Sequence, residues 1–172
     1  MCNHVFMGHA DGVTCMRCGL RMTTDEYMAY LKIAYHNLTT LHRNLVHDAG
    51  WFGNHEQLGD WYNQISDQLD DLTETGIALG IAEPSIKDAV LAYSGDIITC
   101  EPRELQETLR MTQDIFHRII DMMQDAEKTV PAAIANKLQE YEYHWNKEAN
   151  YKIAHAIGSA GRGGPVVEDD DD

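Results

Sequence analysis

The fold is decided by residues 54–80, which read NHEQLGDWYNQISDQLDDLTETGIALG. The large apolar side chains of this stretch recur at the spacing of one face of an α-helix: Leu58, Ile65, Leu69, Leu72 and Ile77. Asn54 is a suitable N-cap, and Gly80 is a suitable residue to end the helix. The pattern therefore predicts one long amphipathic helix from Asn54 to Gly80.

A second amphipathic pattern precedes it, over residues 23–47. Its apolar positions again share one helical face: Tyr27, Leu31, Ala34, Leu38, Leu41 and Leu45. Thr23 and Glu26 have the spacing of a capping box, and the acidic pair Asp25 and Glu26 suits the positive end of the helix dipole. Residues 48–53 contain two glycines. We expect a turn there that folds the two helices into an antiparallel hairpin.

The next segment predicts a short helix and two further long ones. Glu83-Pro84-Ser85 starts a helix over Ile86–Tyr93, and Ser94-Gly95-Asp96 interrupts it, so this piece is expected to be a crossover. Pro102 and Pro131 are each expected in the first turn of a long helix. The third long helix has an apolar face of Leu105, Leu109, Ile115, Phe116, Ile119 and Met123. The fourth has Ile134, Leu138, Tyr141, Trp145, Ala149 and Ile157.

The order of elements is therefore long, long, short, long, long, with no sustained strand-like alternation. These elements predict an all-α protein with a four-helix domain over residues 23–157. Residues 158–165 contain too much glycine to hold a helix, and the acidic end up to Asp172 is expected to be a disordered tail.

Composition narrows the functional classes. The 172 residues suffice for a single core, and no apolar run approaches the roughly 20 residues of a membrane helix. The N-terminus has no signal-peptide pattern, so we expect a soluble, cytoplasmic protein. The 13 basic and 28 acidic residues give a formal net charge of −15, which disfavours direct contact with DNA or an anionic membrane.

Residues 1–22 predict a small zinc-binding knuckle. Four ligands are arranged in two pairs, Cys2 with His4 and Cys15 with Cys18, and three thiolates with one imidazole suit tetrahedral zinc. His9 is an alternative to His4. A redox function for the Cys-x-x-Cys pair ranks lower, because that motif normally opens a helix. Bound zinc would supply the folding energy of this segment, whose partner could be nucleic acid, another protein or the end of the bundle.

Two carboxylates in the second helix are candidate metal ligands. Asp70 and Glu74 are four residues apart, so they share a helical face and can bind one cation together. His55 lies fifteen residues before Asp70, about four helical turns away, and cannot reach the same ion within one chain. A shared site would need a second helix or a second chain.

This arrangement resembles the Dps family of mini-ferritins. In that family a His-Glu pair opens the second helix and is followed by an aspartate fifteen residues after the histidine and a glutamate nineteen after it. His55, Asp70 and Glu74 keep these spacings. Ala-Leu-Gly at residues 78–80, the run EYHWNKEA at residues 142–149 and the short crossover helix are also similar to family features. The resemblance covers roughly residues 24–157.

The resemblance implies a ferritin-like four-helix bundle that assembles as a homo-oligomeric shell, a dodecamer in this family. It also implies a ferroxidase centre between two chains, in which His55 and a first-helix histidine of one chain face Asp70 and Glu74 of the other. Such a centre oxidises Fe(II) with peroxide or oxygen, and the shell stores the iron, limiting oxidative damage.

The sequence departs from the family at two expected ligand positions. A histidine normally lies twelve residues before the His-Glu pair, where this chain has Arg43. Either His42 takes its place, or His36 or His47 does. The acidic residue four after the histidine is replaced by Gly59, with Asp60 beside it.

Other side chains are expected to have structural roles. Trp51 or Trp61 could donate an electron near the site, but core packing is the expected role of both. Cys100 is expected to be a buried thiol, and His144 a packing residue.

The departures support a second hypothesis, an inactive ferritin-like scaffold that docks partners through the knuckle and the acidic tail. Ferritin-like proteins of undefined activity, some of them carried by phages, have a similar His-to-Glu pattern. A third hypothesis, that the acidic surface mimics DNA, rests on charge alone. Protection of DNA by direct binding is not supported, because residues 168–172 are acidic where the family usually has a lysine-rich terminus.

Overall fold

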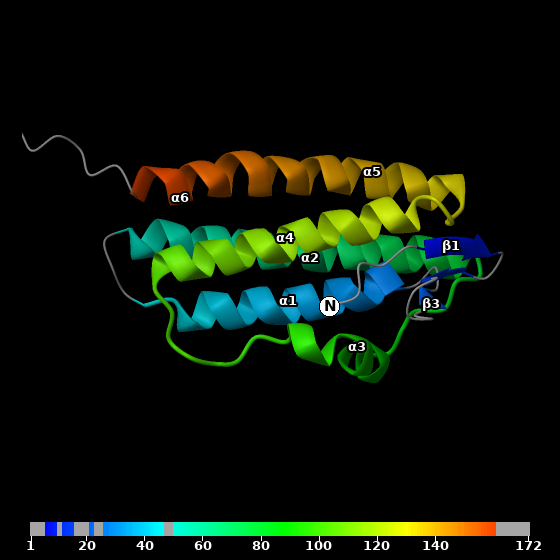
Figure 1. Cartoon of the computed structure of the whole chain (residues 1–172), viewed down its shortest axis with the longest axis horizontal. Helices are drawn as coiled ribbons and strands as arrows, with labels where there is room; N and C mark the ends of the chain where they lie inside the picture. The colour runs from blue at the N-terminus through cyan, green and yellow to red at the C-terminus, as the bar shows by residue number, and fades with distance from the viewer. Residues whose placement is uncertain (1–5, 10–11, 16–20, 23–25, 47–49, 161–172) are drawn as a thin grey trace, which may run out of the picture.

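The computed structural model describes residues 6–9, 12–15, 21–22, 26–46 and 50–160, and it has the expected all-α bundle as its main body (Figure 1). The long helices are α1 (Glu26–Asn44), α2 (Trp51–Ala78), α4 (Leu105–Ala126) and α5 (Ala132–Lys147). The helix α5 continues through η2 (Glu148–Ile153) into α6 (Ala154–Ala160). The crossover contains α3 (Ile86–Tyr93) and the short turn η1 (Ser94–Asp96).

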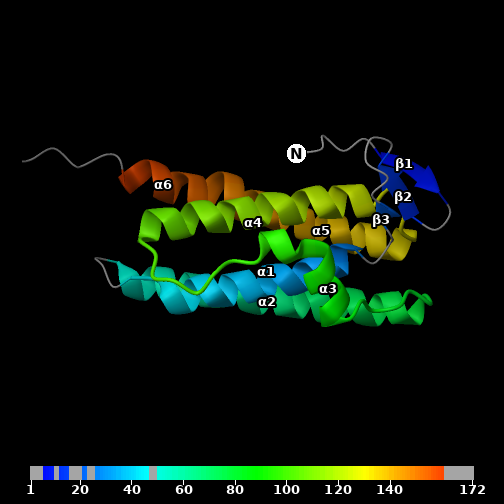
Figure 2. The same ribbon diagram turned by 60° about the horizontal axis from the view of Figure 1, so that its bottom comes forward.

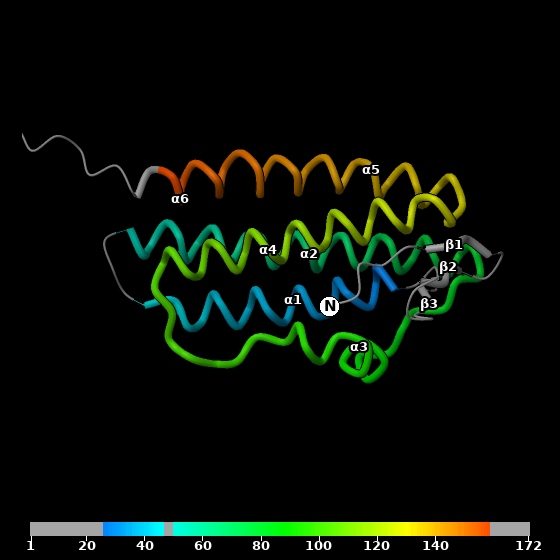
Figure 3. The backbone as a smooth tube through the Cα atoms, viewed as in Figure 1, coloured from blue at the N-terminus to red at the C-terminus, as the bar shows by residue number. Residues whose placement is uncertain are grey.

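The four long helices form two hairpins. The pair α1 and α2 lies on one side, and the pair of α4 with the continuous helix α5–α6 lies on the other (Figures 1 and 2). The crossover returns the chain along α1 to the end of the bundle where α2 began (Figure 3). As a result α2 and α4 run in the same direction, so the bundle is not a simple up-down-up-down arrangement.

The apolar faces predicted from the sequence form the core, apart from Ile77. All six apolar positions predicted for the first helix are buried, although Leu45 lies one residue beyond the end of α1, and aromatic rings fill the centre of the bundle. The ring of Phe116 lies 5.3 Å from that of Trp61 and 4.5 Å from that of Trp145, measured between centroids. Ile77 is 59% exposed, because the last turn of α2 extends beyond the core.

Both central tryptophans have hydrogen-bond partners across the contact between α2 and the continuous helix of α5 and η2. The indole Nε1 of Trp145 donates to Gln68 Oε1 at 2.8 Å, and that of Trp61 donates to Glu148 Oε2 at 3.0 Å. Glu148 is only 3% exposed, and its other oxygen lies 2.7 Å from the ammonium of Lys152. A buried carboxylate is tolerated here because both of its oxygens have partners.

The fourth long helix contains a π-helical segment that the sequence did not predict. It spans Glu148–Ile153, and the helix continues beyond it to Ala160 rather than ending near Ile157. Gln113 of α4 donates its side-chain amide to the carbonyl of Ala149 at 2.9 Å. This bond from a neighbouring helix satisfies one backbone acceptor within the wider turn.

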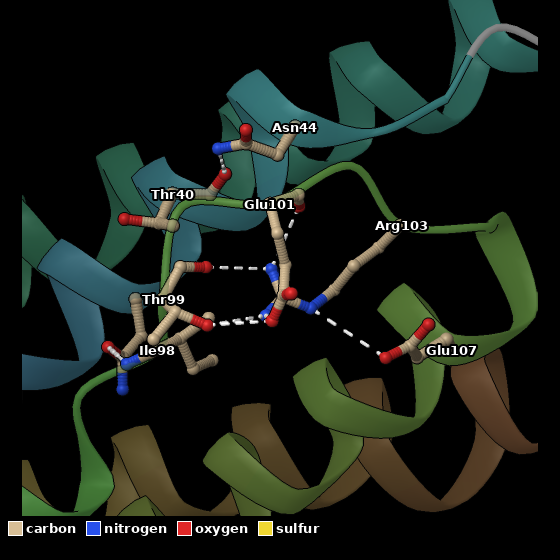
Figure 4. Close-up of polar contacts among 8 residues, drawn as sticks. Thr40, Asn44, Ile98, Thr99, Glu101, Arg103 and Glu107 are labelled. Atoms are coloured by element: carbon tan, nitrogen blue, oxygen red, sulfur yellow. Dashed lines mark hydrogen bonds and ion pairs between the residues drawn. The ribbon is translucent and has the colours of Figure 1, made fainter.

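Asn37 fixes the crossover to the bundle, and Arg103 orders the end of the crossover. Asn37 of α1 donates to the carbonyl of Asp96 at 2.8 Å and accepts from the amide of Ile98 at 3.0 Å. Arg103 is 5% exposed, and its guanidinium binds the carbonyls of Thr99 and Glu101 at 2.9 and 3.1 Å (Figure 4). The bonds of Asn37 hold the crossover against α1, and those of Arg103 hold residues 99–103 around its guanidinium.

Three local expectations were wrong. The helix α2 begins at Trp51 rather than at Asn54, because Gly50 has a φ of 92° and turns the chain earlier; Asn54 lies in the first turn and donates to the carbonyl of Gly50. Pro102 precedes α4 by three residues, since Arg103 pairs in a bridge with Leu45 instead of entering the helix. Cys100 is exposed rather than buried.

The N-terminal segment contains a small sheet, although no strands were expected. The strands β1 (Phe6–His9), β2 (Gly12–Cys15) and β3 (Arg21–Met22) pair antiparallel in the order β1-β2-β3. Cys15 is the last residue of β2, opposite Phe6. Among all these described segments, no helix has the length and apolar character needed to cross a membrane.

Candidate metal centre

Two histidines from different helices lie together on the α1–α2 hairpin. His42 comes from the last turn of α1, and His55 from the second turn of α2. Their ring centroids are 3.7 Å apart, with an interplanar angle of 39°. The turn at Gly50 brings the two helix ends together and thereby creates the pair.

The structure decides between the candidate histidines of the first helix that it describes. His42 contacts His55, whereas His36 and Arg43 are exposed on another face of α1. His47 lies outside the described residues. His42 is therefore the first-helix histidine that shares a location with His55.

Aromatic side chains continue this pair on both sides. The ring of Trp51 lies 4.5 Å from that of His55, and the ring of Tyr62 lies 5.3 Å from that of His42. Tyr35 meets Tyr62 edge-on at 5.8 Å. We call these five side chains, Trp51, His55, His42, Tyr62 and Tyr35, the aromatic row. Trp61, by contrast, is a buried core residue, as expected.

The surroundings of His42 favour its uncharged form. Burial lowers the pKa of His42, and the neighbouring His55 and Arg43 lower it further. A neutral imidazole has a free nitrogen lone pair, which is the form that binds a metal ion. The pair is thus suited to act as a nitrogen donor at neutral pH.

Gly59 lies beside the ring of His42. A Cβ atom at Gly59 would lie 3.7 Å from His42 Nε2, at ordinary van der Waals contact. This is the position where the sequence lacks an expected acidic ligand. A side chain there would therefore begin against His42, and the glycine supplies no carboxylate at this position.

The predicted carboxylates lie elsewhere on the same chain. Asp70 and Glu74 are exposed on α2, and fifteen residues of helix separate Asp70 from His55 by about 22 Å along the axis. Within the described part of the chain, no three His, Cys, Asp or Glu side chains are grouped closely enough to hold a metal ion. One chain therefore brings His42 and His55 together but does not add Asp70 and Glu74 to them.

The proposed zinc ligands are not tested by the structure. Cys2, His4 and Cys18 lie outside the described residues, and for Cys15 only the position of its backbone in β2 is described. The zinc knuckle stays a prediction.

Sequence comparisons give no family for the chain: no protein-family profile and no curated protein matches it. Solved structures do match. A Dps variant from Listeria innocua has a TM-score of 0.71 at 12% identity, over 78% of this chain and 91% of that chain. Dps from Staphylococcus aureus gives 0.69 at 14%, over 78% and 91%, and a Dps protein from Bacillus brevis gives 0.71 at 17%, over 78% and 91%.

The structural match defines the architecture. The bundle has the ferritin-like fold of the Dps proteins, with the crossover helix between the second and third long helices, which confirms the fold class predicted from the sequence. At these identities the likeness establishes the fold, and function has to be argued from the side chains.

Proposed function

We propose that the chain is a Dps-like ferroxidase, which binds Fe(II), oxidises it with peroxide or oxygen and stores the ferric product in a homo-oligomeric shell. The observation that carries this proposal is the contact of His42 on α1 with His55 on α2, at 3.7 Å between ring centroids. The helix of His55 also presents Asp70 and Glu74.

The site is completed by a second copy of the chain in this proposal. His42 and His55 supply nitrogen, whereas Asp70 and Glu74 supply oxygen and are too far along α2 to reach the same ion. A twofold axis relating two α1–α2 hairpins would bring the carboxylates of each chain to the histidines of the other, because such an interface repeats every contact twice. From the resemblance to the Dps family we also propose that the chain forms a homo-oligomer and that this assembly is a dodecamer.

The ligand types suit the chemistry. Imidazole nitrogen and carboxylate oxygen both bind Fe(II), and the carboxylates stabilise the higher charge of Fe(III). The neutral state of His42 leaves its lone pair available to the incoming ion. The net charge of −15 per chain would raise the local concentration of cations around an assembly of such chains.

Anaerobic addition of Fe(II), followed by peroxide, tests the activity. The absorbance of Fe(III) is compared between the unmodified protein and the double variant Asp70→Ala with Glu74→Ala. A matched control replaces two other exposed carboxylates, Asp67 and Asp121, by alanine. We expect fast oxidation in the unmodified protein and the control, and slow oxidation in the double variant. Equal rates in all three would refute the ferroxidase proposal.

Mixing two inactive variants tests whether the site is shared between chains. One parent has Asp70→Ala with Glu74→Ala and keeps the histidines, and the other has His42→Ala with His55→Ala and keeps the carboxylates. Co-refolded dimers that contain one chain of each kind have one intact site and one that lacks all four ligands. Recovered oxidation in the mixture supports the shared site, whereas a site within one chain predicts no recovery.

A catalytically inactive scaffold is the second candidate, favoured by the exposed Arg43 and by Gly59 at two expected ligand positions. The knuckle and the acidic tail would then dock a protein partner. This candidate predicts no rate above that of the double variant, together with an intact oligomer in native mass spectrometry.

A further inference from the structure

A pocket of about 230 Å³ lies at the end of the bundle where α2 and α4 begin and α6 ends (Figure 1). Three helices contribute its apolar lining: Trp61 comes from α2, Leu109 from α4 and Ile153 from η2. Trp61 is only 3% exposed, so its indole lies at the inner side of the pocket. Neither His42 nor His55 belongs to the lining, and the pocket is therefore separate from the candidate metal centre.

Two polar side chains provide hydrogen-bond donors in this pocket. Lys152 Nζ lies 2.7 Å from Glu148 Oε1, which leaves two of its three ammonium hydrogens available, and the lysine side chain is 47% exposed. The side-chain amide of Gln57 has no hydrogen-bond partner among the described residues. Asn54, by contrast, already donates its amide to the carbonyl of Gly50 at 2.9 Å. A ligand can therefore be bound through Lys152 and Gln57.

The charge of the lining favours an anion. Lys152 is the one charged side chain among the described residues that line the pocket. Its partner Glu148 is 3% exposed, and both carboxylate oxygens of Glu148 are already bound, one by Lys152 and one by Trp61. A cationic ligand would meet the ammonium directly, whereas a carboxylate would accept a charge-assisted hydrogen bond from it.

The size of the pocket limits the rest of the ligand. A cavity of about 150 Å³ in a protein core is large enough for benzene. A pocket of about 230 Å³ thus has room for one aromatic ring and a short side chain. The indole of Trp61 offers such a ring an aromatic neighbour, and the π-helical turn that contributes Lys152 and Ile153 is a feature often found at functional sites.

We propose that this pocket binds a small aromatic carboxylate. The ring packs against Trp61, Leu109 and Ile153, and the carboxylate accepts hydrogen bonds from Lys152 and Gln57. This function is additional to the proposed oxidation of Fe(II) and requires no metal ion.

Calorimetry on the full-length protein without added iron tests the proposal, with phenylacetate as the probe. We expect a Kd of about 1 mM or lower. Phenylacetamide has the same shape without the charge, and phenylethylamine has the opposite charge. Both should bind at least about tenfold more weakly, because neither accepts a charge-assisted hydrogen bond from Lys152.

Filling the pocket tests where the probe binds. Gly53 lines the pocket, and a Cβ atom at this position would meet no atom within 4 Å, so Gly53→Leu fits the helix and occupies the space. This variant should lose phenylacetate binding. Gly158→Leu is the matched control, since Gly158 is a helical glycine with equally open surroundings that is not part of the lining.

A double variant tests the role of the ammonium. Lys152→Met combined with Glu148→Gln removes both charges of the ion pair, so no buried carboxylate is left alone, and the glutamine oxygen still accepts from Trp61. This variant should bind phenylacetate at least about tenfold more weakly and phenylacetamide as before.

NMR of the indole N–H groups locates the probe in the unmodified protein and does not depend on the folding of any variant. Phenylacetate should shift the signal of Trp61 more than that of Trp51 or Trp145. No binding at about 10 mM phenylacetate would overturn the proposal. Unchanged binding in Gly53→Leu, or equal affinity for phenylacetate and phenylacetamide, would also overturn it.

Discussion

The imidazole rings of His42 and His55 lie 3.7 Å apart between centroids, although the two residues belong to different helices. Protonation of both would place two positive charges in contact, and Arg43 adds a third nearby. The pair is therefore held together most favourably when at least one ring is neutral. This property makes the site sensitive to acid in a way that can be measured.

Replacing Arg43 by glutamine should raise the pKa of His42, because one of the positive charges that lower it is removed. The titration of the His42 ring protons in NMR measures this shift. Because Arg43 is exposed, the difference between variant and unmodified protein should shrink at high salt. Lys128→Gln removes a positive charge from the loop after α4 and should leave His42 unchanged. An equal shift in both variants would contradict a local effect.

The same residue predicts how stability depends on pH. The folded state lowers the pKa of His42 below its usual value of 6.5, so the unfolded chain takes up more protons there on acidification. The contribution of His42 to stability is thus present above pH 6.5 and is lost as the pH falls below it. Burial also lowers the pKa of His144, so His144 contributes to the same loss. Urea unfolding of His42→Gln should therefore show a smaller loss of stability in this window than the unmodified protein, and an unchanged pH dependence would count against the lowered pKa of His42.

Gly59→Asp should supply a carboxylate to the candidate metal centre at His42 and His55. The new Cβ would contact His42 Nε2 at 3.7 Å without a clash, and its charge would raise the pKa of His42. We expect Fe(II) to bind about tenfold more tightly, or ~1.4 kcal/mol. Gly59→Asn, which has the same size and no charge, is the control, and anaerobic calorimetry measures both. Equal Fe(II) affinities of the aspartate and asparagine variants would show that a negative charge at this position does not stabilise the bound ion.

Arg103 should be more important for stability than any exposed cation of the chain. Its buried guanidinium has acceptors at Thr99 and Glu101, and it lies 3.7 Å from a carboxylate oxygen of Glu107 (Figure 4). Arg103→Met should lower the free energy of unfolding by about 2–4 kcal/mol, because the acceptors lose a charged partner. Arg103→Lys should recover little, since an ammonium lacks the fork of donors. Urea unfolding measures the free energy of unfolding of both variants. If Arg103→Lys were as stable as the unmodified protein, the forked geometry of the guanidinium would not be needed.

Removal of zinc should affect only the N-terminal segment. We predict one zinc per chain by elemental analysis, lost in the double variant Cys15→Ser with Cys18→Ser. A chelator should unfold residues 1–22, as seen by faster amide exchange there, and leave the helical signal unchanged. Loss of bundle helicity on chelation would contradict a separate knuckle.

Helix positions were predictable because they follow from local periodicity. The crossover helix Ile86–Tyr93 has the predicted bounds, because Ser85 caps it and the Ser-Gly-Asp sequence ends it. The start of α2 was wrong because of the local turn at Gly50, whereas the start of α4 depends on a distant contact. Arg103 lies outside the helix because it pairs with Leu45, which is more than fifty residues away in the sequence. The residues around Arg103 contain no pattern that predicts this contact.

The candidate site was predictable in part. The spacing of His55, Asp70 and Glu74 indicated a centre shared between chains, and the structure keeps the carboxylates away from the histidine within one chain. The choice of His42 over His36 needed the crossing of α1 and α2 and the turn at Gly50. The position of Tyr62 between His42 and Tyr35 could not be predicted, because edge-to-face contacts between aromatic rings have no characteristic spacing in the sequence.

The wide turn at Glu148–Ile153 also bears on how this chain and its structural neighbours can differ in length. Deleting one residue from a regular α-helix rotates everything beyond it by about 100° and moves its apolar face out of the core. A π-turn already holds one surplus residue, so a shortened relative can close it to an α-turn and keep Trp145 and the residues after Ile153 on their original faces. A gap placed within this helix is therefore the physically correct way to align such sequences.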